Sequence, residues 1–347
     1  MDSLRLELPA AIAGRVGALD ELKGVAILLV VLYHAGGVLG VSNTLHGEVG
    51  VDMFVILSGI GMALSSDTGT AGRFLLRRFW RIYPAYWIVL TAFLVGDALV
   101  LGRRFTAEDM LLHYLGLHAW FGDAYALSIN DSFWFVTLIA TLYLIYAPLR
   151  RLAEKPDRLL FAGALVSSAA AVYFFRARQY MAFDHLSLRI PGFFLGLLFG
   201  RLLKTGRLDL SASTALGAAF LLLFYVPFTH DFVYATSWVG AALMIGYTCL
   251  IRPFFSTGTR GALKFLGDRS LEIFLIHQPL MREYNILAQH ELFPTAAVTA
   301  ASMAAGIVIA VGVSVVIGAA LHSLLGALPV PWRLSGQPTH HDNISPR

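Results

Sequence analysis

Charged residues are scarce in this chain of 347 residues. Asp, Glu, Lys and Arg make up 14% of it, whereas roughly a quarter of a typical soluble domain is charged. Hydrophobic residues reach 57%, and the mean hydropathy is +0.68. This composition excludes an ordinary soluble globular protein and predicts an all-α, polytopic bundle of membrane helices.

Cysteine is nearly absent, because Cys249 is the single one and lies within an apolar run. One thiol can build neither a disulfide framework nor a thiolate metal cluster. The histidines are scattered without the H-x3-H spacing of a helical metal site, so we expect no metal. The net charge of +4 falls in short basic clusters between apolar runs, as in membrane loops, so we expect no nucleic-acid partner.

Ten apolar runs have about the length that crosses a bilayer, and we expect each to be a transmembrane helix. They lie at about 23–41, 48–65, 84–102, 132–149, 159–176, 189–204, 212–229, 234–251, 270–289 and 295–325. Pro84 marks the beginning of the third run. No A-x-A cleavage site precedes the first run, so we expect an uncleaved signal anchor.

Lys and Arg are distributed unevenly over the loops. If the N-terminus is cytoplasmic, the cytoplasmic segments hold 20 of the 26 basic residues. Such an excess is typical of cytoplasmic loops, so we expect both termini in the cytoplasm. We also expect one transmembrane domain over 1–332 and a disordered polar tail at 333–347.

The longest connection, 103–131, contains a segment that is too short and too polar to span a bilayer. It includes His113, His118 and Trp120. The segment is either an amphipathic surface helix anchored by Trp120 or an interfacial element whose histidines contact a substrate.

Ionisable residues interrupt the first two apolar runs. Lys23 and His34 are eleven residues apart, which on a helix places them within about 20° of one face and about 16 Å apart. Ionisable side chains inside a bilayer cost free energy, and they are therefore usually retained for a function. Asp52 lies early in the second run, so we expect it to contact His34 and hold its tautomer, as in acyl-transfer triads. The alternatives are an inert histidine bonded to a carbonyl and an aspartate that caps its helix.

A basic and aromatic segment at 73–87 precedes the third run, with the sequence RFLLRRFWRIYPAYW. Arg78 and Arg81 are three residues apart, and Arg77 and Arg81 are four apart, so they share a helical face. Guanidinium groups bind phosphate oxygens bidentately, and Lys23 lies at the same membrane level. The segment is either a clamp for a polyphosphate such as coenzyme A or the basic collar with which many membrane helices begin.

The order of these motifs resembles the acyltransferase-3 family of integral membrane O-acyltransferases. The residues that carry the resemblance are Lys23-x10-His34, GVDMFVILSGI at 50–60, RRFWRIYPAYW at 77–87, SFWFVTLIATLYLIYAP at 132–148 and SLEIFLIHQPLM at 270–281. Together they cover nearly the whole chain.

The resemblance implies an enzyme of the bacterial inner membrane that moves an acyl group, such as acetyl, from cytosolic acyl-CoA to a hydroxyl. The acceptor would be a sugar or a lipid-linked or exported glycan, and no cofactor would be bound permanently. His34 matches the catalytic histidine, Asp52 the acid of the second helix and Lys23 the basic partner.

Further positions match the family. Arg78 and Arg81 match its R-x-x-R pair, and His277 matches a histidine in its penultimate helix. Ser58, Trp134 and His277 are candidate acceptor or pocket residues. Two positions depart from the pattern: Lys23 stands where arginine is commoner, and Ile139 where many members carry glutamate, which favours a branch with a different acceptor.

Two other functions fit parts of the sequence. A proton-coupled secondary transporter would use His34, Asp52 and His277 as a proton relay and the arginines to bind an anionic solute. The chain lacks the paired broken helices in matching halves that such transporters show. In a purely structural membrane protein, the charges would serve insertion alone.

Overall fold

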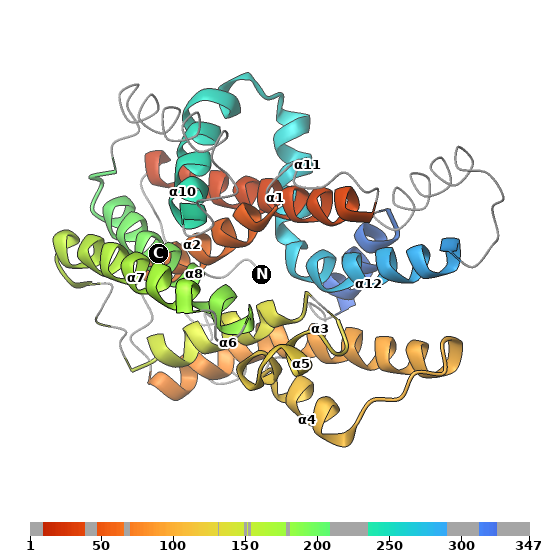
Figure 1. Ribbon diagram of the computed structural model, residues 1–347. Coiled ribbons are helices and arrows are strands. Elements are labelled where there is room, and N and C mark those ends of the chain that lie inside the picture. The colour runs from red at the N-terminus through yellow and green to blue at the C-terminus, as the bar shows by residue number, and fades with distance from the viewer. Residues whose placement is uncertain are drawn as a thin grey trace, which may run out of the picture.

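The structure, a computed structural model, describes residues 10–38, 47–65, 70–130, 132–148, 151, 154–177, 181–208, 235–289 and 312–324. Every regular element in these ranges is a helix, which confirms the all-α prediction (Figure 1).

The helices follow one another without long connections in the part of the chain that the structure describes. They are α1 (Ala10–Val38), α2 (Glu48–Leu64), α3 (Ala71–Val100), α4 (Ala107–Leu115), η1 (His118–Phe121), α5 (Asp123–Ala126), α6 (Trp134–Tyr146), α7 (Asp157–Ala177), α8 (Met181–Lys204), α10 (Thr236–Gly246), the π-helix η5 (Tyr247–Ile251), η6 (Arg252–Phe254), α11 (Thr257–Asp268) and α12 (Ser270–Gln289). A further helix covers Gly312–Leu324.

Two of the described helical segments, Ala71–Leu99 and Leu186–Lys204, are long and apolar enough to cross a membrane. The number of ten spans and the position of the termini therefore stay predictions. The expected span at 212–229 and the tail at 333–347 lie outside the described residues, and of 295–325 only 312–324 is described.

Two helices begin well before the apolar runs that predict them. The apolar run at 23–41 lies within α1, which begins at Ala10, and the run at 84–102 follows the beginning of α3 at Ala71. Thr70 caps α3, since its side chain accepts a hydrogen bond from the backbone N–H of Arg73. Hydropathy detects only the apolar part of a helix. A helix can continue beyond that part through residues that favour helix but are less apolar. Pro84, expected at the start of the third helix, therefore lies inside α3.

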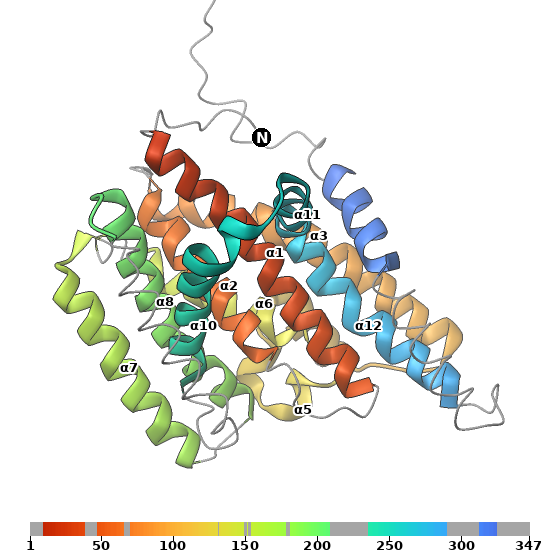
Figure 2. The ribbon, with the colours of Figure 1, turned by 90° about the horizontal axis from the view of Figure 1, so that it is seen from above.

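The centre of the bundle is α2, which packs against α1, α8 and α10 (Figure 2). Its contact with α8 is so close that only a glycine fits at position 196. A Cβ there would lie 2.2 Å from the carbonyl oxygen of Ile56. On the other side of α1, α12 contacts both α1 and α3, and α11 packs along α1. These contacts bring α1, α2, α3, α6 and α12 around one space.

The connection at 103–131 forms the short helices α4, η1 and α5, as the prediction of a non-spanning segment requires. This connection packs against α3, because Tyr86 of α3 donates a hydrogen bond to the carbonyl oxygen of His113. His113 and His118 are completely buried and stack with ring centroids 3.9 Å apart. Both rings thus lie inside the molecule and not on its surface, while Trp120 is exposed and donates a hydrogen bond to Thr141.

Candidate active site

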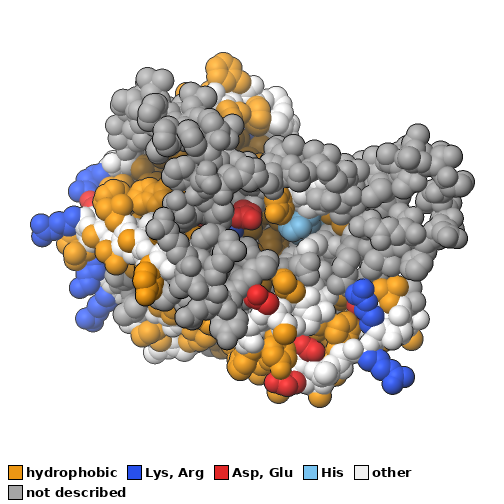
Figure 3. Space-filling view, in the orientation of Figure 1, with side chains coloured by type: hydrophobic (Ala, Val, Ile, Leu, Met, Phe, Trp, Pro, Cys, Tyr) orange, Lys and Arg blue, Asp and Glu red, His pale blue; other side chains and the backbone are white. Residues whose placement is uncertain are grey.

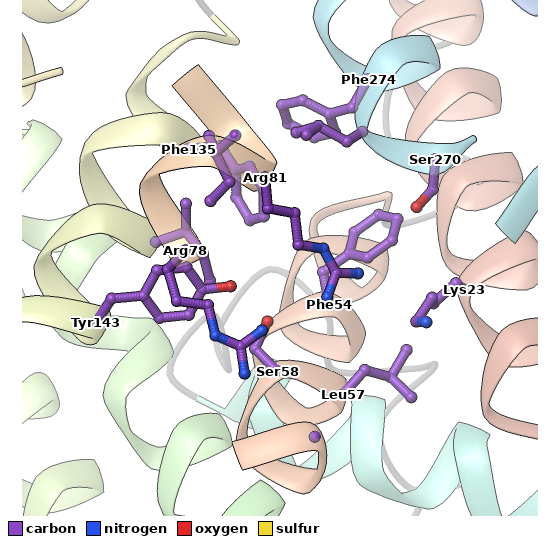
Figure 4. A pocket seen from close by; sticks show the side chains of 14 residues that line it. Lys23, Phe54, Leu57, Ser58, Arg78, Arg81, Phe135, Tyr143, Ser270 and Phe274 are labelled. Atoms are coloured by element: carbon purple, nitrogen blue, oxygen red, sulfur yellow. The ribbon is translucent and has the colours of Figure 1, made fainter. Parts of the chain in front are cut away.

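A cleft of about 150 Å³ lies between α1, α2, α3, α6 and α12 (Figure 4). Lys23, Arg78 and Arg81 line it, so the structure brings together cations from two helices that are far apart in sequence. The other walls are mostly apolar. They are formed by Phe54, Leu57, Ser58, Gly61, Ile82, Phe135, Ile139, Tyr143, Ser270, Leu271 and Phe274.

The cations of the cleft are held in different ways. The Arg78 guanidinium lies over the rings of Phe74 and Tyr143, at 5.3 and 5.2 Å from their centroids. Such cation–π contacts orient the planar group without using its N–H donors. Arg81 is exposed and forms no ion pair with any residue that the structure describes. Both arginines therefore retain donors for a ligand, and Figure 4 shows their side chains reaching into the space opposite Lys23.

Lys23 is held at the base of the cleft by an ion pair. Its Nζ lies 2.9 Å from Asp20, and Asp20 also pairs with Lys264 at 3.0 Å. Burial raises the pKa of Asp20, but the two ammonium groups outweigh burial and hold that pKa below its ordinary 3.8. Asp20 is thus ionised at neutral pH and fixes Lys23 beside the cleft.

Arg77 does not line the cleft, so the structure brings together only two of the three predicted clamp arginines. On a helix Arg77 is about 40° from Arg81 but about 100° from Arg78. A cleft that faces Arg78 and Arg81 therefore leaves Arg77 at its side.

Two histidines meet eleven residues along α1 from Lys23. His277 Nε2 lies 3.0 Å from His34 Nδ1. His277 is fully buried, and its Nδ1 lies 2.7 Å from the carbonyl oxygen of Phe274. A carbonyl only accepts, so His277 Nδ1 carries a proton and, in the neutral ring, Nε2 accepts. His34 Nδ1 is then the donor, and it also lies 2.9 Å from the carbonyl oxygen of Val30 one turn earlier in α1. These hydrogen bonds assign the lone pair of His34 to its Nε2.

The predicted contact between His34 and Asp52 is wrong. The face of α2 that meets α1 carries Gly50, where a Cβ would lie 2.5 Å from the carbonyl oxygen of Ala26. Two residues further on, Asp52 is turned by about 200° and points away from α1. The apolar pattern predicts that the two helices are neighbours, but it does not fix which face of α2 meets α1.

Asp52 belongs to a buried cluster of α2, α8 and α10. It accepts a hydrogen bond from Ser237 Oγ, and its Oδ2 lies 3.6 Å from Arg189 Nε. Arg189 Nη2 lies 3.6 Å from Glu48 Oε2. The Arg189 guanidinium also lies 5.7 Å from the ring centroid of Trp134, at the start of α6. Asp52 and Arg189 are both completely buried.

Arg189, Glu48 and Ser237 are absent from the predicted site. The signal for Arg189 is an ionisable residue beside an apolar run, which is also the signal that identifies His34. Arg189 stands at the first position of the run at 189–204, where a basic residue is readily assigned to the preceding loop. In the structure it lies inside α8, which begins at Met181.

The remaining predicted residues take different places. Ser58 lines the cleft with Lys23, whereas Trp134 lies beside the buried cluster. Ile139 is buried in the cleft wall, and no acidic side chain lines the cleft among the residues that the structure describes. No three His, Cys, Asp or Glu side chains in the described ranges come together as metal ligands.

The sequence profile described as an acyltransferase domain, Acyl_transf_3, matches residues 16–319. "Acyltransferase MdmB" of Streptomyces mycarofaciens is 26% identical over 319 residues, covering 81% of this chain and 80% of the relative. "Putative membrane-bound transacylase BcsY" of Komagataeibacter xylinus is 27% identical over 305 residues, covering 75% and 72%. "Putative acetyltransferase ORF330" of Acidianus two-tailed virus is 28% identical over 227 residues, covering 62% and 67%. No solved structure matches the chain.

The matched range contains every residue that lines the cleft and every residue of the histidine pair and the buried cluster. A profile match over most of the chain assigns its family directly. The chain belongs to the acyltransferase-3 family and is a transferase of acyl groups.

Proposed function

We propose that this protein is a multi-pass membrane O-acyltransferase that moves an acyl group, most simply acetyl, from cytosolic acyl-CoA to a hydroxyl of a sugar or exported glycan. The observation that carries the proposal is the arrangement along α1. A cleft lined by three cations lies near Lys23, and the histidine pair lies about 16 Å further along the same helix.

The cleft is suited to the phosphates of the donor. Lys23, Arg78 and Arg81 supply positive charge, and the described lining holds no carboxylate to oppose it. Charge-assisted bonds from guanidinium to phosphate are among the strongest in proteins. The apolar walls of Phe54, Phe135 and similar side chains suit the pantetheine arm, which would lead the thioester toward His34.

The chemistry follows from the tautomer of His34. Its Nε2 takes the proton of the acceptor hydroxyl while the hydroxyl oxygen attacks the thioester carbonyl. The C–S bond then breaks, and the coenzyme A thiolate takes the proton from His34, which restores the neutral imidazole. His277 accepts the Nδ1–H bond throughout, so it holds the ring in position and stabilises its transient charge. The products are an ester and free coenzyme A.

The family match favours this enzyme over the proton-coupled transporter, which shares the histidines but makes no ester. The test is release of coenzyme A from acetyl-CoA by the purified full-length protein. We expect turnover by the wild type and its loss in His34→Ala, with the variant still folded. Wild-type turnover in His34→Ala would falsify the mechanism, and proton movement driven by acetyl-CoA without any ester would favour the transporter.

A further inference from the structure

The buried cluster of Glu48, Asp52 and Arg189 has no part in the reaction proposed above. None of the three guanidinium nitrogens of Arg189 makes a hydrogen bond with any residue that the structure describes, and the same holds for Asp52 Oδ2. The separations of 3.6 Å in the cluster are too long for hydrogen bonds. Buried polar atoms are almost always bonded, so these donors and this acceptor are available to a ligand.

One member of the cluster is partly exposed, and the cluster lies near the histidines. The Glu48 side chain is 34% exposed, although Asp52 and Arg189 are buried. Tyr33 lies within electrostatic range of both Glu48 and Arg189, and its ring contacts that of His34 at 5.3 Å. Figure 3 shows an acidic side chain and a histidine near each other on one face of the molecule.

The position along α2 separates the cluster from the donor cleft. Ser58 lines the cleft and Asp52 belongs to the cluster, six residues and about 9 Å apart on the helix axis. Under the topology predicted from the loop charges, the cluster lies toward the non-cytoplasmic end. A ligand there would approach His34 from the side opposite to the coenzyme A phosphates.

The charges of the cluster select the kind of ligand. The cluster sets one guanidinium among two acidic side chains, so it has no excess of positive charge with which to bind an anionic ligand. Vicinal hydroxyls instead match the set, because a hydroxyl oxygen accepts from Arg189 while hydroxyl protons donate to Asp52 and Glu48. The Arg189 guanidinium lies over one face of the Trp134 indole, which leaves the ring edge beside Arg189 as an apolar surface for the C–H face of a sugar ring.

We propose that this cluster binds the acyl acceptor as a neutral sugar ring, an inference that rests on the proposed function. Arg189 and Asp52 bind adjacent hydroxyls, Glu48 binds a further one at the exposed edge, and Trp134 contacts the ring. The sugar is thereby held with another hydroxyl directed at His34 Nε2.

The test is acetyl transfer from labelled acetyl-CoA to methyl glycosides of glucose, galactose and N-acetylglucosamine, with the full-length protein in a detergent without a sugar headgroup. We expect Glu48→Gln and Arg189→Lys to raise the KM for the best glycoside by about tenfold or more. The KM for acetyl-CoA and the sugar-independent hydrolysis stay unchanged. Glu108→Gln, the same substitution at an exposed site of α4, is the matched control and leaves both KM values unchanged.

Glucuronate provides a second, charge-based readout. The wild type should accept it poorly compared with the methyl glucoside, and Glu48→Gln should narrow that difference in rate because it removes an acidic side chain from the cluster. An unchanged glycoside KM in Glu48→Gln, or a preference for glucuronate, would overturn the inference. If the protein hydrolyses acetyl-CoA but no glycoside accelerates the reaction, the sugar site is wrong and the proposed donor binding is not affected. If the protein does not turn over acetyl-CoA at all, the proposed function itself is wrong.

Discussion

His277 orients His34 through one hydrogen bond in the proposed mechanism. We expect His277→Leu to lower kcat by about 10- to 100-fold with an unchanged KM for acetyl-CoA, because His34 Nδ1–H keeps the carbonyl of Val30 but loses the acceptor that holds the ring against α12. Glutamine offers an amide oxygen at a similar reach, so His277→Gln should restore most of the rate. Steady-state kinetics of both variants check this, and equal damage by Leu and Gln would assign His277 a packing role.

Arg81 contributes a partly exposed cation to the cleft, so its loss should weaken donor binding without damaging the fold. A hydrogen bond to a charged group is worth about 1.5–3 kcal/mol, which corresponds to about 10- to 100-fold in affinity. We expect Arg81→Ala to raise the Kd for acetyl-CoA by that factor in isothermal titration. Arg73→Ala, on the same helix but outside the cleft lining, is the control. Equal effects of the two substitutions would argue against a specific phosphate site.

That Lys23, Arg78 and Arg81 come together could be predicted from the sequence, but the partners of His34 and Asp52 could not. Spacing along one helix places Lys23 and His34 on one face, and it places Arg78 and Arg81 together. The partners of His34 and Asp52 depend on how helices are rotated against each other. That rotation is fixed by small contacts such as Gly50 against Ala26, which no apolar pattern reveals.

The contact between α1 and α11 supports the base of the cleft. A Cβ at Gly267 would lie 1.9 Å from the carbonyl oxygen of Asp20, so the two helix backbones nearly touch. Overpacking of this kind costs about 1–3 kcal/mol, and we expect Gly267→Ala to lower the Tm by several degrees. Gly261→Ala on the same helix meets no atom within 4 Å and should leave the Tm unchanged or raise it slightly. A Gly267→Ala protein as stable as Gly261→Ala would show that the helices are further apart.

Asp20 adds a pH dependence to the same contact. Its folded pKa lies below the ordinary 3.8 because of Lys23 and Lys264, so the stabilisation is present above that value and is lost as the pH falls through the folded pKa. Thermal unfolding should therefore be insensitive to pH from 7 to 5 and weaken below about pH 4. Asp20→Asn should lower the Tm at pH 7 and reduce the further loss in acid. An identical acid profile in Asp20→Asn would assign the loss to other carboxylates.

The extent of the helices was predicted less well than their presence. Alanines and three charged residues among them extend α1 back to Ala10, and α3 continues through Pro84 from a cap at Thr70. The helix α11 is amphipathic and polar on one face, so it contains no apolar run long enough to span a bilayer and was not predicted. Apolar runs therefore identify the membrane core of the bundle but not the helices at its margin.

The loop charges predict an orientation with both termini in the cytoplasm, and cysteine labelling can test this prediction. In a Cys249→Ala background, Arg104→Cys should react with an impermeant maleimide on intact cells. Lys155→Cys should react only after the cells are permeabilised. Both positions are exposed in the structure. The reverse pattern would place the cationic cleft on the outer side and exclude a cytosolic donor.

The division of α1 into a donor end and a reacting end is the central claim, and one comparison tests it most directly. Acetyl-CoA affinity and coenzyme A release are measured on the same preparations of wild type, His34→Ala and Arg81→Ala. We predict that His34→Ala keeps the wild-type Kd and loses turnover by about 10²-fold or more. Arg81→Ala should lose affinity and recover much of its turnover at saturating acetyl-CoA. If His34→Ala instead loses affinity, or if both variants lose affinity and turnover together, the two ends of α1 do not have separate roles and the account is contradicted.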